Sequence, residues 1–155
     1  MTSVLMLSDT GDLLLHDLDF PEDYVNKQHK NDYKIYDNPI KEYLYVKKSH
    51  HNRLLLRISY KIENNNYVPI SFICDTGAPS GIYLSKYAKN IIKSRIHEDE
   101  LQNEYIILND NKKINVSDTP LQHGDINIFG IQILDYLCLK LSNGNFILER
   151  LGDYL

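Results

Sequence analysis

The chain of 155 residues has no tryptophan and only two cysteines, Cys74 and Cys138. Two cysteines are too few for a disulfide framework, and their spacing matches no zinc motif. Only His50 and His51 are adjacent among the six histidines, so no metal site is predicted. No apolar run approaches membrane-spanning length, and residues 1–7 lack the basic residues of a signal peptide. We therefore expect a cytoplasmic protein with reduced thiols and no membrane partner.

The chain also lacks an excess of positive charge, since 17 Lys and Arg stand against 21 Asp and Glu and the formal net charge is −4. A chain with this balance has no global basic field, and we expect no nucleic-acid partner. The acidic charge is concentrated in the first 23 residues, which contain six Asp and Glu and no Lys or Arg. A solvated surface is the simplest explanation of that segment.

Residues 1–50 are predicted to be an N-terminal extension to the body of the protein. Two apolar runs flank Asp9-Thr10-Gly11, which predicts a hairpin with a turn at that tripeptide. Asp19 and Pro21 then indicate the start of a short helix. The polar, Tyr-rich segment 32–49 is predicted to be an irregular or extended connection.

Residues 51–155 form the predicted body, in which short strands alternate with turns. Ser85 is a plausible N-cap for the longer of two predicted helices. The predicted strands lie at 53–62, 67–74, 81–85, 104–108, 113–116 and 125–130, with helices at 85–96 and 131–137 and a final hairpin around Asn143-Gly144. A mainly β chain of short strands with one or two short helices indicates a small barrel or sandwich.

One strand ends on a carboxylate. The apolar run 67–74 stops at Asp75, and Thr76, Gly77 and Ala78 follow before the next apolar strand. Glycine and alanine allow the backbone to turn tightly and to approach a ligand or another chain closely. A carboxylate held rigidly between two strand ends is a candidate for acid–base chemistry.

The extended sequence VPISFICDTGAPSGIYLS resembles the catalytic loop of retropepsin-like aspartic proteases. A second motif supports the resemblance, because Asn127, Ile128, Phe129 and Gly130 match the hydrophobic-Gly motif of that family. Gly130 follows Asp75 by 55 residues, close to the family spacing. The resemblance covers residues 53–151 and implies a retropepsin-like acid-protease barrel in which this motif begins a short helix and packs beside the catalytic loop.

The resemblance also implies roles for individual residues. Asp75 is the expected catalytic residue, Thr76 the residue that braces two loops across a dimer axis, and Gly77 part of the catalytic loop. Ala78 and Pro79 are expected to bind substrate, and apolar strand residues Ile107 and Leu108 to line substrate pockets. The predicted function is hydrolysis of peptide or protein substrates by a homodimer, with one Asp75 from each chain and no cofactor.

Asp9 offers another partner for Asp75 within one chain, but a bilobal enzyme needs a second hydrophobic-Gly motif. No glycine lies between Gly11 and Gly77, so we favour the homodimer. The candidate flap over the cleft is the hairpin at 105–116, whose tip, residues 109–112, lacks the glycines usual in that family.

Two other functions stay open at this point. One is a weak or inactive retropepsin-like domain that acts as a dimerisation or peptide-binding module, and the other is an unrelated β-barrel binding protein. Two roles also stay open for the acidic extension, namely packing on the body or masking the cleft as a pro-segment.

Overall fold

A computed structural model of the chain describes residues 32–39, 41–48, 51–120, 126–142 and 145–151. The predicted N-terminal hairpin and helix, including Asp9, lie outside these residues. The described part is mainly β, as predicted, with two short α-helices.

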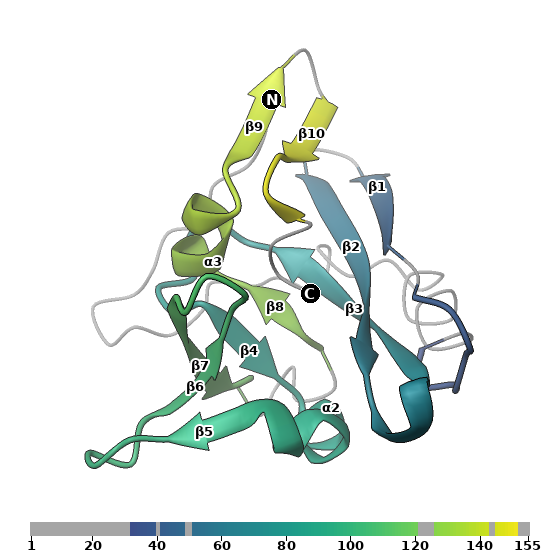
Figure 1. Ribbon diagram of the computed structural model, residues 1–155. Helices are drawn as coiled ribbons and strands as arrows, with labels where there is room; N and C mark the ends of the chain where they lie inside the picture. Colours follow the sequence, from purple (N-terminus) through teal and green to yellow (C-terminus); the bar gives the residue numbers. More distant parts are fainter. Residues whose placement is uncertain (1–31, 40, 49–50, 121–125, 143–144, 152–155) are drawn as a thin grey trace.

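The elements follow one another as a series of short strands with the helices between them (Figure 1). The strands are β1 Lys41–Lys48, β2 His51–Lys61, β3 Tyr67–Cys74, β4 Ile82–Leu84, β5 Ile96–Glu98, β6 Glu104–Ile107, β7 Lys113–Asp118, β8 Ile128–Phe129, β9 Leu139–Ser142 and β10 Asn145–Leu148. The helices are α2 Lys86–Ile92 and α3 Ile131–Tyr136, with 3₁₀ turns η2 Glu63–Asn65 and η3 Lys93–Arg95.

Eight strands form one mixed sheet in the order β1-β2-β3-β8-β4-β7-β6-β5. Within the described residues β1 and β5 are the two edges and do not pair with each other. Because a barrel requires its first and last strands to pair, the predicted closed barrel is wrong and the sheet is open. Strands β9 and β10 form a separate ribbon that extends from one end of the molecule (Figure 1).

The centre of the sheet contains the shortest strand. β8 lies between β3 and β4, parallel to β3 and antiparallel to β4. The loop that leaves β3 must therefore pass over the end of β8 before it enters β4. This topology places residues 75–81 beside residues 128–131, although 46 residues separate these segments in the sequence.

Several local predictions are confirmed. The Ser85 hydroxyl accepts a hydrogen bond from the Ala88 amide at 3.1 Å, so Ser85 caps α2 as expected. The hairpins β2–β3, β6–β7 and β9–β10 all form. In the last of them Ser142 pairs with Asn145, which is the register of the predicted two-residue turn.

The segment 32–49 differs from its prediction in one part. β1 is not an irregular connection but a full strand, antiparallel to β2 along its whole length. The described sheet therefore includes β1 as its first strand.

One large apolar cluster lies on one face of the sheet and includes Leu56, Phe72, Phe129 and Leu134, all fully buried. The Phe72 and Phe129 rings from neighbouring strands β3 and β8 pack with centroids 4.2 Å apart. This packing secures the two-residue strand β8, whose few backbone hydrogen bonds alone would hold it weakly.

Candidate active site

Asp75 lies directly after β3, and its backbone fixes the start of the loop. The Asp75 amide donates to the Phe129 carbonyl of β8 at 2.9 Å. The Ala78 amide donates back to the Asp75 carbonyl at 3.2 Å, which closes a tight turn. Within that turn the Gly77 amide donates to Asp75 Oδ1 at 2.9 Å. The carboxylate thus has a defined orientation and is 2% exposed.

The predicted hydrophobic-Gly motif packs against this loop. The Gly130 amide donates to the Gly81 carbonyl at 2.7 Å, and the Ile131 amide donates to the Ala78 carbonyl at 2.8 Å. A Cβ atom on Gly130 would lie 1.9 Å from the Ser80 carbonyl oxygen. Only glycine fits here, because the obstacle is backbone and not a side chain that could move aside. α3 begins at the next residue, so the structure brings this segment and the start of a helix beside the Asp75 loop.

Thr76 occupies the turn beside Asp75. Its Oγ1 atom is buried and makes no hydrogen bond within the part of the chain that the structure describes. A buried hydroxyl without a partner costs about 1–3 kcal/mol, so such atoms are rare in native proteins. The hydrogen-bonding capacity of this hydroxyl is therefore unused within the described residues.

A second apolar cluster surrounds the loop on the other face of the sheet. It consists of Leu55, Ile73, Ala78, Tyr83, Ile126 and Ile128. Its polar member is Tyr83, whose hydroxyl oxygen accepts from the Ser80 amide at 2.9 Å. Burial raises the pKa of Tyr83, and the charge of Asp75 raises it further, while the Ser80 bond opposes the shift.

The sequence interpretation missed Tyr83 and Ser80 as site residues. The signal for Tyr83 is the alternation of side chains along a strand, since Ile82 and Leu84 of β4 point into the large core. That alternation puts Tyr83 on the opposite face, toward the loop.

A polar groove of about 480 Å³ adjoins the loop. Its lining comes from three places: the end of the loop and β4, the β5–β6 hairpin, and β7. The lining residues are Pro79, Ser80, Tyr83, Asn103, Glu104, Asn115, Val116 and Ser117. Of the predicted substrate-binding residues, Pro79 lines this groove, and Ala78 is buried beside it.

Ile107 and Leu108 do not line the groove. Ile107 is 43% exposed at the end of β6, whereas Leu108 is 2% exposed and belongs to the large core. The tip of their hairpin, the candidate flap, lies near the C-terminal segment, because Arg150 Nη2 is 3.4 Å from Asp110 Oδ2.

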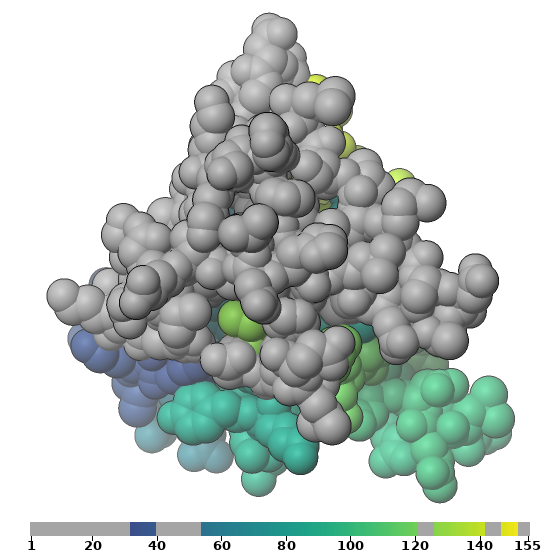
Figure 2. Space-filling model, turned by 180° about the vertical axis from the view of Figure 1, so that it is seen from behind, coloured from purple at the N-terminus to yellow at the C-terminus, as the bar shows by residue number. Residues whose placement is uncertain are grey.

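A different hairpin faces the loop across the groove. β5 and β6 are joined by residues 99–103, and Asn103 and Glu104 form one wall of the groove. The Asp99 carboxylate organises this tip by accepting from the Leu101 and Asn103 amides. The hairpin projects from the body in both views, and Leu101 at its tip is 80% exposed (Figures 1 and 2).

Cys74 immediately precedes Asp75 and is partly buried, as is Cys138. Burial raises the pKa of the Cys74 thiol, and the neighbouring Asp75 charge raises it further. Among the described residues, no group of three or more His, Cys, Asp and Glu is placed to hold a metal ion. No helix in the same residues is long and apolar enough to cross a membrane.

Comparison with known proteins gave no match to a family model, to a curated protein or to a solved structure. The resemblance to retropepsin-like proteases therefore stays a prediction that depends on the residues themselves. Residues 75–79 and 128–130 meet at one site, while Ile107 and Leu108 lie elsewhere.

Proposed function

We propose that this chain is a homodimeric aspartic endopeptidase whose catalytic pair consists of one Asp75 from each protomer. The observation that carries the proposal is the contact between the Asp75 loop and Gly130. A strand-end carboxylate fixed by Gly77 and packed on a hydrophobic-Gly motif is the arrangement that the resemblance implies.

The chemistry requires two carboxyl groups, and one chain supplies one in this loop. Two adjacent carboxylates cannot both ionise easily, so the pair shares one proton. The ionised member takes a proton from a bound water, whose oxygen attacks the scissile carbonyl carbon. The protonated member gives its proton to the carbonyl oxygen, and the resulting intermediate collapses with protonation and release of the amine. Activity should therefore fall at both ends of an acidic pH range.

The buried Thr76 hydroxyl is an observation in favour of a second protomer. Its Oγ1 has no partner among the described residues, and a symmetry-related loop would supply one. We expect Thr76→Val to weaken the dimer about tenfold or more, from about 1–1.5 kcal/mol for each lost hydrogen bond. Thr76→Ser keeps the hydroxyl and should keep the dimer.

The groove supports a peptide as the substrate. It runs from Pro79 and Ser80 to the β5–β6 hairpin, and extended chains commonly bind along strands with alternate side chains in pockets. Its Ser, Asn and Glu side chains favour a polar residue at this position of the substrate, so apolar specificity does not extend to this groove. We assign the covering role to the β5–β6 hairpin in place of the hairpin at 105–116.

One observation favours a second candidate, a peptide-binding or dimerisation module without useful activity. Asp75 is 2% exposed, whereas catalysis requires the carboxyl group to reach water and a peptide bond. The same dimer and the same groove would serve that function.

The sequence Asp-Thr-Gly occurs twice in the chain, so the same substitution in the other copy provides the control for the test. Asp75→Asn should abolish cleavage of a peptide library between pH 3 and 7 and leave the sedimentation of the dimer unchanged. Asp9→Asn changes the same residue type in the other Asp-Thr-Gly copy and should leave cleavage unchanged. Wild-type cleavage by Asp75→Asn would refute the protease. A wild type that dimerises and binds peptides but cleaves none of them would establish the module instead.

A further inference from the structure

The edge of β3 that faces β8 is only partly covered by that strand. The Ile73 amide donates to the Asn127 carbonyl at 2.9 Å, and the Asp75 amide donates to the Phe129 carbonyl at 2.9 Å. β8 pairs with the last residues of β3 only, so the backbone groups along the first half of the same edge need other partners.

Residues 32–36, which we call the strap, supply those partners. Tyr36 and Tyr67 exchange two backbone hydrogen bonds of 2.8 Å, and the Tyr33 amide donates to the Pro69 carbonyl at 2.9 Å. Pro69 has no amide hydrogen, so its carbonyl is the group that needs a partner. The strap and β8 thus cover one edge of β3 in succession.

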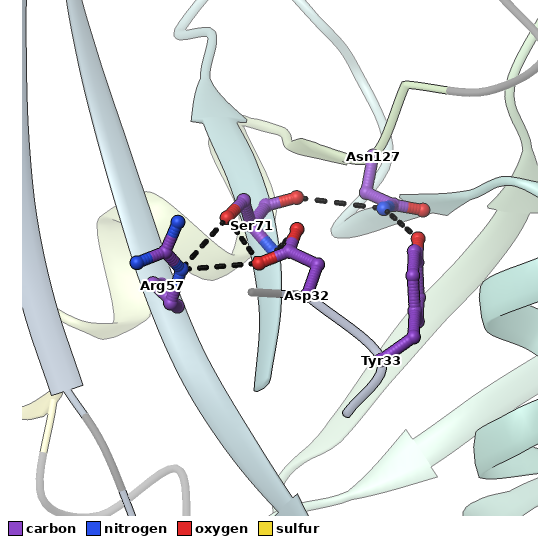
Figure 3. A network of polar contacts seen from close by, with 5 residues as sticks. All are labelled: Asp32, Tyr33, Arg57, Ser71 and Asn127. Carbon is purple, nitrogen blue, oxygen red and sulfur yellow. Dashed lines mark hydrogen bonds and ion pairs between the residues drawn. The ribbon is translucent and has the colours of Figure 1, made fainter. Parts of the chain in front are cut away.

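Ser71 lies where the strap ends and β8 begins, and a carboxylate fills the gap (Figure 3). Asp32 Oδ2 accepts from the Ser71 amide at 3.0 Å, and Asp32 Oδ1 accepts from the Ser71 hydroxyl at 2.9 Å. The Ser71 carbonyl accepts from Asn127 Nδ2 at 3.4 Å. Asp32 therefore takes the place of a strand carbonyl at this position.

The buried charge of Asp32 is balanced from β2. Arg57 stands opposite Ser71 in the strand register, and its Nε donates to Asp32 Oδ1 at 3.0 Å. The two side chains are 8% and 2% exposed. Burial raises the pKa of Asp32, while the Ser71 hydrogen bonds and the Arg57 charge oppose that rise.

Asn127 carries the connection onward to the site. Its Nδ2 donates to the Tyr33 hydroxyl oxygen at 2.9 Å, and its Oδ1 accepts from the Ser85 amide at 2.9 Å. Tyr33 adopts a left-handed backbone conformation, with φ of 63°, which is uncommon for a bulky residue. Such a conformation persists where surrounding contacts fix it, and here both the amide and the hydroxyl of Tyr33 are held.

We propose that Asp32 and Tyr33 are positioning residues for the Asp75 site, acting through Ser71 of β3 and Asn127 at the start of β8. Asn127 is followed by Ile128 and Phe129, and the Phe129 carbonyl holds the Asp75 amide. The strap therefore fixes the spacing between β3, from which the loop leaves, and β8, which supports the loop. The expected effect on kcat rests on the proposed protease function, whereas the expected effect on the contact between β3 and β8 does not.

Cys74 reports on the site without any need for catalysis. It lies one residue before Asp75 and is paired with Phe129 in the β3–β8 register. Looser contact between β3 and β8 should expose its thiol more often. Cys138, at the end of α3, serves as an internal reference in the same molecule.

The decisive variant is Tyr33→Phe in the full chain, because it removes one hydroxyl and leaves the ring. We expect Cys74 to react with iodoacetamide about three- to tenfold faster, the change in local opening expected for one lost hydrogen bond. The Cys138 rate should stay unchanged, and the thermal midpoint should fall by only about 2–4 °C for each kcal/mol that the lost hydrogen bond contributed. Tyr36→Phe makes the same chemical change in the strap, where Tyr36 is held through its backbone, and should alter neither thiol.

Enzyme kinetics give the second readout. Tyr33→Phe and Asp32→Asn should lower kcat and leave KM nearly unchanged, since neither residue lines the groove. Unchanged Cys74 rates in both variants, or equal acceleration of both thiols, would refute the positioning role. If the wild type cleaves no peptide, the protease function fails, and the Cys74 rates still decide whether the strap positions the loop.

Discussion

Gly130→Ala tests the contact on which the site is built. The new Cβ would lie 1.9 Å from the Ser80 carbonyl oxygen and 2.9 Å from the Ala78 carbonyl oxygen, while ordinary contact begins at 3.4 Å. The loop and the start of α3 must therefore separate by roughly 1.5 Å, a shift of the kind that overpacking forces on a tight interior.

The cost has two parts. Overpacking of a close contact costs about 1–3 kcal/mol. The separation also breaks the bonds from the Gly130 amide to Gly81 and from the Ile131 amide to Ala78, each worth about 1 kcal/mol. We expect a loss of about 3–5 kcal/mol, which lowers the Tm by about 6–20 °C in a chain of this length.

Thermal unfolding followed by circular dichroism measures this loss. Asp135→Ala, at an exposed position of the same helix, is the control and should stay within about 0.5 kcal/mol of wild type. A Gly130→Ala protein with the wild-type Tm would show that the loop does not pack on β8 and α3 in this way, and the site as described would be wrong.

Two further predictions concern single side chains. Because burial raises the pKa of the Cys74 thiol, its reactive thiolate should form only above the pH at which ordinary thiols ionise. Alkylation at pH 8, followed by mass spectrometry, should therefore show slower modification of Cys74 than of Cys138. Faster modification of Cys74 would contradict its burial. The same Leu→Ala change should act differently at a buried and at an exposed site. Leu108 is 2% exposed, and Leu108→Ala should lower the free energy of unfolding by about 2–5 kcal/mol. Leu101 is 80% exposed, so Leu101→Ala should leave stability within about 0.5 kcal/mol of wild type but raise KM if the hairpin covers the substrate. Equal Tm values for the two variants would refute the burial of Leu108.

The local elements could be predicted because their signals are contained in a few neighbouring residues. Ser85 precedes a helical pattern, and Asn143-Gly144 separates two apolar runs, so each element follows from short-range rules. The strand and the short helix on either side of Gly130 were likewise predictable from their residues, whereas the place of this motif beside Asp75 was implied by the resemblance to retropepsin-like proteases.

The features that could not be predicted depend on pairing between distant segments. The Asp32–Arg57 ion pair joins residues 25 positions apart, and no local pattern marks either as buried. The open sheet was missed because alternation along strands does not say whether the edge strands meet. The core position of Leu108 was missed because the apolar run 106–108 does not reveal which of its faces is inside.

The central position of β8 has a consequence for synthesis of the chain. In the part of the chain that the structure describes, the strands before it, β1–β3 and β4–β7, pair within their own groups, and β8 joins the two groups. Residues 128–129 leave the ribosome after all the strands of both groups, since synthesis proceeds from the N-terminus. A nascent chain can therefore form two separate half-sheets early, but the Asp75 loop has no support until the last fifth of the chain has begun to emerge. Translation that stops before residue 128 should release two half-sheets whose inner edges are uncovered where β8 would pair, and such edges are prone to aggregation.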